Sequence, residues 1–567
     1  MRKYLILLIG FAVACSSGET DKKNISPYDL HLNGVVADNA MVVCAHPVAA
    51  RIGREILQKG GNAVDAAVAV QAALAVCYPN AGNLGGGGFM VLRWNDGRTE
   101  SLDFREKAPQ KAHEDMFLDG QGYVIPELSL GSGLSSGVPG SVDGWAESHR
   151  KYGKLSWQEV IQPAIDIARN GFHITAMQAH EMNSLDSLFR VRNPQSNYFK
   201  HDQPWVKDDL LKQEDLAQCL ERIRDQGRDG FYTGETAKQI IQTIHATGGI
   251  MTDVDLNTYQ SVWRQPVIGA YKGRQIISMP PPSSGGIVLL QMLTMLEDQP
   301  LTSMGFQSPD YMHMLAEVER LAYADRAVHL GDPDYWDVPQ KQLLDPIYLK
   351  ERVKSIKPVA TSSDSINAGV FIKESEQTTH LSIVDKEGNA VAVTTTLNAS
   401  YGSKIFVKGC GFLLNNEMDD FSSKPGVPNL YGLTGGRANA IKGGKRMLSS
   451  MTPTIILKEG KLHMVLGSPG GSTIITSVMQ TFLNVEEFGM SLQEAIDTPR
   501  FHHQWIPDEI QVEQGRFSWD VLHALEARGH NIYVREPIGR VDGIMVRADG
   551  KLEGAADPRG DDKAEGF

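Results

Sequence analysis

The amino-acid sequence predicts an α/β protein of the mixed α+β type, because helical and strand patterns dominate different parts of the chain. Residues 47–77 and most of residues 145–355 carry helical patterns, whereas the chain after Thr378 is rich in strand patterns. Of its 567 residues, 41% are hydrophobic and 22% are charged, which is ordinary for a globular protein with a large core. The net charge of −13 argues against non-specific nucleic-acid binding, since no basic surface is available to release phosphate counterions.

The first residues have the shape of an export signal. Two basic residues precede an apolar run over residues 5–14, which is too short to span a bilayer. Residues 12–14 form an A-x-A cleavage site, and Cys15 directly after it resembles a lipoprotein box, although the usual leucine of that box is Ala12 here. We favour the lipoprotein site, with a lipid anchor at Cys15. We assign residues 1–15 to the signal segment, and both alternatives predict a periplasmic protein.

Residues 47–77 predict two consecutive helices. The glycines at 60–61 stop the first, and Asn62 can cap the second, which Pro79 closes. The many alanines of the second helix suit close packing against a sheet. A glycine run at 85–88 leads into a strand; no Lys-Ser/Thr follows it, so we interpret it as a tight turn and not as a nucleotide loop.

Three other patterns resemble functional motifs but are better explained as structural. Residues 133–137 fit the G-x-S-x-G motif, yet the Val-Pro-Gly at 138–140 prevents the helix that a nucleophile elbow needs. His502 and His503 are the only adjacent histidines, and neighbours on a strand point to opposite faces. The four cysteines after the signal are scattered, so the sequence predicts neither a metal site nor a disulfide framework.

The stretch "ESEQTTHLSIVD" at 374–385 changes from a polar loop pattern to a strand pattern at Thr378 and Thr379. The strand runs into the turn sequence "DKEGN" and a second strand returns. A hairpin centred on Glu387 places Thr378 opposite Thr396, with Cβ atoms ~5 Å apart. Taken alone, this observation is also explained by two ordinary β-branched strand residues.

A functional interpretation of Thr378 requires a base, because a threonine hydroxyl is a weak nucleophile. If the chain is cut before Thr378, the new α-amine, whose pKa is roughly 7.7–8, can accept the hydroxyl proton. The polar, irregular stretch 357–377 would supply a flexible approach to the cut. The chain could cut itself: the Thr378 hydroxyl attacks the Gln377 carbonyl, and the resulting ester is hydrolysed. The product would be an N-terminal-nucleophile hydrolase.

An ordered set of motifs resembles the γ-glutamyltranspeptidase family over nearly the whole chain after the signal. In chain order the motifs are "GGNAVDAAVA", "AGNLGGGGFM", "LDFREKAP", "TTHLSIVD", "TTTLN", "NNEMDDF", "LSSMTPTI", "GSPGGS" and "DPR". The resemblance implies a four-layer αββα sandwich, with a large subunit at 16–377 and a small catalytic subunit at 378–567. It implies γ-glutamyltransferase and glutathione hydrolase activity on glutathione and other γ-glutamyl compounds, with amino acids or peptides as acceptors and without a metal or cofactor.

The same resemblance assigns the catalytic groups. It makes Thr378 the nucleophile and Thr396 its hydrogen-bonding partner, in agreement with the hairpin register. It makes the backbone N–H groups of Gly470 and Gly471 the oxyanion hole, since adjacent N–H groups can stabilise developing negative charge. A tight turn at the two glycines is the structural alternative, and it is compatible with that role.

A γ-glutamyl group carries a free α-carboxylate and a free α-ammonium, and the resemblance assigns residues to each charge. For the carboxylate these are Arg105, whose guanidinium suits a carboxylate bidentately, and the hydroxyls of Ser449 and Ser450. For the ammonium they are Asp420, with Glu417 and Asn398 beside it. The loop at 422–436 resembles a lid, with Tyr431 closing over the substrate. The structural alternative for Arg105 is a surface salt bridge to Glu106 or Asp103. For the serine pair it is a turn before Pro453, and for the segment that bears Asp420 it is a capped surface loop.

Two other functions remain open from the sequence. Glutaryl (cephalosporin) acylases belong to the same superfamily, but their substrates lack the α-ammonium, so Asp420 argues against this alternative. An uncut, inactive homologue that acts as a binding protein is the second. The intact set of Thr378, Thr396, Gly470 and Gly471 argues against it.

Overall fold

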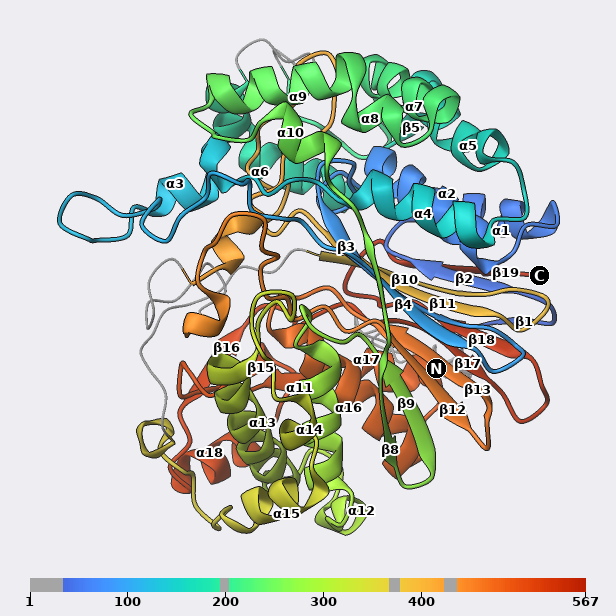
Figure 1. Cartoon of the computed structure of the whole chain (residues 1–567). Coiled ribbons are helices and arrows are strands. Elements are labelled where there is room, and N and C mark those ends of the chain that lie inside the picture. Colours follow the sequence, from blue (N-terminus) through green and yellow to red (C-terminus); the bar gives the residue numbers. More distant parts are fainter. Residues whose placement is uncertain (1–33, 194–202, 367–377, 423–435) are drawn as a thin grey trace, which may run out of the picture.

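The computed structural model describes residues 34–193, 203–366, 378–422 and 436–567 (Figure 1). Two seven-stranded sheets pack face to face, and helices cover the outer face of each sheet. The α/β class predicted from the sequence is confirmed, and so is the four-layer αββα arrangement that the resemblance implies. In the described residues no helix combines the length and the apolar composition that crossing a bilayer requires.

The first sheet contains the strand that begins at Thr378. Its order is β19 (Lys563–Gly566), β2 (Met41–Cys44), β10 (Thr378–Val384), β11 (Ala390–Thr396), β3 (Gly87–Arg93), β4 (Thr99–Phe104) and β7 (Val262–Arg264). All neighbouring strands are antiparallel. Every residue of the central strands β10, β11 and β3 is buried, because helices cover one face and the second sheet covers the other.

The second sheet draws its strands from four separate parts of the chain. Its order is β1 (Val35–Ala37), β18 (Leu552–Ala555), β17 (Asp542–Val546), β13 (Lys461–Gly467), β12 (Thr454–Lys458), β9 (Arg274–Ser278) and β8 (Val267–Tyr271). Strands β7 to β9 interrupt a segment for which the sequence predicts mostly helices. They are three to five residues long and lie between long helical segments, whose pattern dominates the region.

The helices of the first outer layer cover the sheet that holds β10. The main ones are α1 (Pro47–Gln58), α2 (Ala63–Cys77), α4 (Ser141–Tyr152), α5 (Trp157–Asn170) and α7 (Glu214–Gln226). All residues of α2 are buried, as its alanines predict. Asn62 caps α2 by accepting hydrogen bonds from Val64 N and Asp65 N, both at 3.0 Å. Asp65 accepts in return from Asn62 N at 2.9 Å, which completes a capping box.

Further helices and a two-stranded sheet complete this side of the molecule (Figure 1). They are α3 (Pro126–Leu130), α6 (Ala176–Arg192), α8 (Asp229–Tyr232), α9 (Gly234–Ala246), α10 (Asp253–Asn257), β5 (Phe172–His173) and β6 (Leu210–Leu211). The serine at the centre of the G-x-S-x-G pattern, Ser135, lies in a single 3₁₀ turn with no strand leading into it. Its hydroxyl donates to Ser132 O at 2.6 Å, so the structure supports a structural role.

The second outer layer lies on the other sheet. Its helices are α11 (Gly285–Leu296), α12 (Leu301–Met304), α13 (Pro309–His329), α14 (Gln340–Leu343), α15 (Pro346–Lys354), α16 (Thr473–Phe488), α17 (Leu492–Asp497) and α18 (Trp519–Ala527). A small sheet of β14 (Phe501–His502), β15 (Ile510–Glu513) and β16 (Ile532–Arg535) lies beside them. The buried α11 and α13 form the centre of this layer's core.

Strand alternation places Thr378 between the two sheets. The register pairs Thr378 with Thr396, as the hairpin predicts. Leu381 and Ile383 of β10 belong to the core under the first helix layer. Ser382 instead donates a hydrogen bond to Asp542 O of the second sheet, at 3.1 Å. Because side chains alternate along a strand, Thr378 shares the inter-sheet face with Ser382, and Thr379 faces the helices.

The stretch before Thr378 is more ordered than its composition predicts. The Ser363 hydroxyl donates to Trp505 O at 2.6 Å, and Ser363 N donates to Asp508 Oδ2 at 2.9 Å. Ala360 N donates to Arg528 O at 2.8 Å. The prediction of a flexible approach is therefore wrong for residues 357–366, whose backbone and small polar side chains find buried partners; residues 367–377 lie outside the described residues.

Candidate active site

A pocket opens where β10 begins and β11 ends, between the two sheets. The following residues line it: Arg105, Arg326, Thr378, Thr396, Asn398, Glu417, Asp420, Phe421, Ser422, Asn439, Leu448, Ser449, Ser450, Met451, Gly471 and Ile474. Of the site residues predicted from the sequence, all that the structure describes line this pocket except Gly470, which directly precedes Gly471. Tyr431 lies outside the described residues. Thr379 does not line the pocket, so strand alternation selects Thr378 from the threonine pair.

The end of β11 holds Thr396 in position. The Thr396 hydroxyl oxygen accepts from Asn398 N at 2.8 Å, and Asn398 itself has a left-handed backbone with φ of 72°. The side chain of Asn398 donates to Asn416 O at 2.9 Å, and Asn83 donates to Thr396 O at 2.9 Å. A hydroxyl that accepts one hydrogen bond can still donate its own proton. Since Thr378 lies opposite, Thr396 can donate to the Thr378 hydroxyl.

Two glycines at the start of α16 present backbone donors. Gly470 and Gly471 have φ of 133° and 56°, which L side chains rarely adopt. The Gly470 carbonyl accepts from Thr473 N at 3.0 Å, so the turn leads directly into the helix. In the part of the chain that the structure covers, neither glycine N–H donates to a protein acceptor. Two N–H groups at the positive end of a helix dipole can therefore stabilise an oxyanion.

Arg105 is buried and pairs with the acidic residues that the sequence places nearby. Its Nη1 lies 2.5 Å from Glu417 Oε1 and 3.5 Å from Glu106 Oε2, and its Nη2 pairs with Asp420 Oδ2. Asp103 accepts from the Arg105 backbone N–H at 3.0 Å, and its carboxylate pairs with the side chains of Arg264 and Arg446. The structural alternative of a surface salt bridge is therefore wrong, because the Arg105 side chain is 1% exposed and lies in the pocket wall.

The carboxylates around Arg105 exceed the positive charge available to them. Burial raises the pKa of Glu106 from 4.5 to about 8, against the opposing effect of Arg105. Burial likewise raises the pKa of Glu417 and of Asp420 above their ordinary values. Glu417 Oε2 is buried and has no hydrogen-bonding partner among the described residues. A bound ammonium group can donate hydrogen bonds to Glu417 and Asp420 and would favour the ionised form of these carboxyl groups.

The serine pair lies beside this cluster. Ser450 Oγ accepts from Arg326 Nη2 at 3.1 Å, and Ser449 Oγ accepts from Met451 N at 3.1 Å. The Ser449 carbonyl accepts from the N–H and the hydroxyl of Ser284, both at 2.7 Å. The two serines are thus part of a pocket wall as well as of the turn before Pro453. Their hydroxyls can donate to an anion that also contacts Arg105.

Sequence reasoning missed two polar residues of the pocket. Arg326 comes from α13, and nothing in its helical stretch distinguishes it from a solvent-exposed arginine. Asn439 donates from Nδ2 to Asp420 O at 2.7 Å, and its Oδ1 accepts from Leu448 N at 3.0 Å. Asn439 therefore connects the segment that bears Asp420 to the segment that leads to the serine pair. Both residues reach the pocket through long-range packing, which no local pattern encodes.

Comparisons with known proteins agree on one family. The family model described as Gamma-glutamyltranspeptidase matches residues 49–567. The "Glutathione hydrolase proenzyme" of Escherichia coli K12 is 49% identical over 538 residues, which cover 94% of this chain and 93% of that protein. The "Acylase ACY 1 proenzyme" of Pseudomonas sp. SE83 is 36% identical and covers 92% of each chain.

The solved structures with a similar fold also include an acylase and a transpeptidase. The cephalosporin acylase from Bacillus halodurans superposes with a TM-score of 0.84 at 27% identity, over 96% of this chain and 98% of that chain. The Helicobacter pylori gamma-glutamyltranspeptidase has a TM-score of 0.56 at 44% identity, over 57% of this chain and 94% of that chain. Among these proteins the sequence identity is higher to the glutathione hydrolase and the transpeptidase than to the two acylases.

Proposed function

This chain belongs to the gamma-glutamyltranspeptidase family, and from that premise we propose that it is a γ-glutamyltransferase and glutathione hydrolase with an N-terminal threonine nucleophile. The Thr378 hydroxyl attacks the γ-carbonyl carbon of a γ-glutamyl compound such as glutathione. The leaving amine, Cys-Gly in the case of glutathione, departs with a proton. Water or an acceptor amine then takes the γ-glutamyl group from the ester.

One observation carries this proposal: Thr378 and the Arg105–Asp420 ion pair line the same buried pocket. A pocket that holds a nucleophile, a cation and several carboxyl groups suits a substrate that carries both a carboxylate and an ammonium. Gly470 and Gly471 offer N–H groups for the oxyanion that forms when Thr378 attacks. We assign the α-carboxylate to Arg105 and the serine pair, and the α-ammonium to Asp420, Glu417 and Asn398.

We further propose that the chain cuts itself between Gln377 and Thr378. The hydroxyl of Thr378 adds to the Gln377 carbonyl, the C–N bond breaks, and water hydrolyses the resulting ester. The relatives named above are proenzymes, which supports processing of this kind. The products would be a large subunit at 16–377 and a small subunit at 378–567. The freed α-amine of Thr378 would then serve as the base in each turnover.

The acylase alternative differs in the charges that its substrate brings to the pocket. Among the described residues that line the pocket, Arg105 and Arg326 are the cations, and Glu417 and Asp420 carry the carboxyl groups. A γ-glutamyl group brings an ammonium, which can donate hydrogen bonds to these two carboxyl groups. A glutaryl group brings a carboxylate without an ammonium, so Glu417 and Asp420 gain no partner from it. The pocket therefore favours the γ-glutamyl group.

The test is a comparison of kcat/KM for γ-glutamyl-p-nitroanilide and glutaryl-p-nitroanilide. A hydrogen bond to a charged group contributes roughly 1.5–3 kcal/mol, so we expect a preference of about 10- to 150-fold for the γ-glutamyl compound. Addition of a dipeptide acceptor should increase anilide release. An equal or reversed preference would support a glutaryl acylase, and absence of turnover on both compounds would support an inactive binding protein.

We propose that the protein is exported to the periplasm and anchored by a lipid on Cys15. The apolar run at 5–14 and the small residues around Cys15 support this proposal; residues 1–33 lie outside the described residues. Mass spectrometry of the mature N-terminal peptide should find a lipid-modified Cys15. An unmodified Cys15 at the terminus would indicate simple A-x-A cleavage and a soluble periplasmic enzyme.

A further inference from the structure

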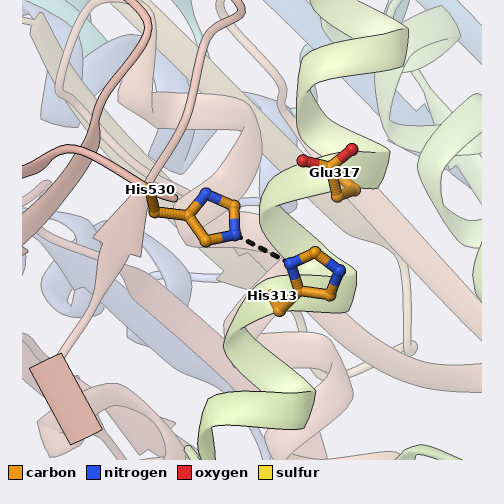
Figure 2. Close-up of side chains that lie close together, drawn as sticks. All are labelled: His313, Glu317 and His530. Atoms are coloured by element: carbon orange, nitrogen blue, oxygen red, sulfur yellow. Dashed lines mark hydrogen bonds between the residues drawn. The ribbon is translucent and has the colours of Figure 1, made fainter. Parts of the chain in front are cut away.

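A cluster of two histidines and one glutamate lies in the second helix layer (Figure 2). His313 and Glu317 come from α13, and His530 comes from the loop between α18 and β16. One potential ligand atom of each residue lies within 4.8 Å of the other two. All three side chains are buried, and none of them lines the pocket.

The hydrogen bonds of the cluster fix which atom of His313 faces the other two residues. His313 Nε2 lies 2.7 Å from Lys357 O, and a carbonyl only accepts, so Nε2 carries the proton. His313 Nδ1 then holds a lone pair, which faces His530 Nε2 at 2.7 Å. A histidine whose second nitrogen donates to a backbone carbonyl has the orientation that metal-ligating histidines have.

Glu317 lies one helical turn after His313, on the same face of α13. Both polar partners of its carboxylate contact the same oxygen: Thr361 N at 3.1 Å and Arg320 Nη2 at 3.2 Å reach Oε1. Within the described ranges, no polar partner contacts Oε2. Arg320 also pairs with Asp508, which shares its positive charge. Glu317 thus keeps one carboxylate oxygen for a further cation.

We propose that His313 Nδ1, His530 Nε2 and the Glu317 carboxylate bind one divalent transition metal of the zinc type. Two imidazoles and one carboxylate form a ligand set that zinc accepts, and water can complete four-coordination. Binding requires that the proton on His530 Nε2 move to Nδ1 of the same ring, so the ring stays neutral. The positive charge of Arg320 opposes the metal, and the carboxylates of Glu317 and Asp508 favour it.

The His502–His503 pair is not part of the cluster: His503 Nδ1 accepts from Trp505 N at 3.0 Å, in agreement with the structural role predicted for it.

The metal would join elements that lie on the two sides of the proposed cut. His313 and Glu317 precede Thr378, and His530 follows it. Lys357 and Thr361, which contact the cluster, belong to the stretch that leads to the cut. If the cut occurs as proposed above, the metal bridges the large and small subunits. The site is structural, since none of its three ligands lines the pocket that holds Thr378, and it does not depend on the cut.

The experiment uses the full-length protein, purified without metal-affinity resin and treated with a chelator. Co²⁺ alone and Zn²⁺ alone are then titrated. We expect one equivalent of Co²⁺ to bind with visible d–d absorption, and Zn²⁺ to raise Tm. His530→Gln and, separately, Glu317→Gln should weaken binding by at least ~10-fold and leave anilide turnover in place. His463→Gln is the matched control, because this partly buried histidine pairs with Glu486 at 2.7 Å outside the cluster.

The proposal would be overturned if the wild-type protein showed neither d–d absorption nor a Zn²⁺-dependent rise in Tm. It would also be overturned if His530→Gln and Glu317→Gln bound Co²⁺ as tightly as the wild type. Either result would leave His313 and His530 as a hydrogen-bonded pair only. Anilide turnover and Tm of the metal-free variants check that these variants are folded. A loss of metal binding in a folded variant is then due to the missing ligand.

Discussion

At the scale of single residues, the contact between Arg105 and Asp420 decides how the pocket distinguishes substrates. The two residues are 315 positions apart and form a buried ion pair. Arg105 faces more carboxylate than it can neutralise, so Asp420 and Glu417 can turn to a substrate ammonium without leaving Arg105 unpaired. The α-carboxylate and the α-ammonium are thus bound by neighbouring parts of one charge cluster.

Asp420→Asn should lower kcat/KM for γ-glutamyl-p-nitroanilide by about 10- to 150-fold, because a charged hydrogen bond to the ammonium is lost. Most of the loss should be in KM, since the contact exists in the ground state and the transition state. The glutaryl anilide should lose much less. Arg105→Lys should reduce turnover of both compounds, since each carries the carboxylate.

Asp334→Asn is the control, because Asp334 pairs with Arg264 outside the pocket and is 46% exposed. If Asp420→Asn reduced both anilides equally, Asp420 would act by positioning Arg105, and the acylase alternative would be strengthened. The motifs place Arg105 and Asp420 in the site, but only the packing of distant segments reveals that they touch.

At the scale of elements, the hairpin of β10 and β11 and the start of α16 build the catalytic geometry. The register of Thr378 with Thr396 follows from the turn sequence and could be predicted from the sequence. The sequence could not predict that Thr378 faces the pocket. Strand alternation gives two faces, and only the packing of the sheets determines which of them is the interior. The short strands β7 and β9 were missed for a similar reason: they pair with β4 and β12, which lie far along the chain, whereas β8 pairs with β9 in a local hairpin.

Gly471→Ala should lower kcat for the γ-glutamyl anilide by at least ~10-fold, with a smaller change in KM. A φ of 56° costs an alanine roughly 1–2 kcal/mol, and relief of that strain would turn the N–H away from the oxyanion. Gly460→Ala is the control, since Gly460 has φ of 77° in the open β12–β13 turn. Equal activities of the two variants would argue against the oxyanion role.

At the scale of the whole molecule, each strand next to the proposed cut pairs with strands from the other side of it. Strand β10 pairs with β2, and β11 pairs with β3. The two products would therefore share one sheet and its core, and they cannot separate without exposing it. The αββα class follows from motifs that the sequence contains, whereas the pairing of chain ends in β19–β2 depends on the complete fold.

Buried carboxylates should also make the stability of the molecule depend on pH. The pKa of Glu106 is raised to about 8 by burial, so the folded state holds a proton that the unfolded state releases near 4.5. Stability from this group is complete below pH 4.5 and is lost as pH rises to about 8. The free energy of unfolding then changes by up to about 1.4 kcal/mol per pH unit. Urea unfolding of Glu106→Gln at several pH values should show a flatter profile, and an unchanged profile would contradict this assignment.

N-terminal sequencing of the purified chains, after separation on a denaturing gel, tests whether the protein cuts itself before Thr378. The wild type should give two polypeptides, the smaller beginning at Thr378. Thr378→Ala should give one uncut, inactive chain. Thr379→Ala should still be cut, because Thr379 faces away from the pocket. A Thr378→Ala protein that still divides at this position would show that another protease makes the cut, and would contradict the account of Thr378 as the nucleophile.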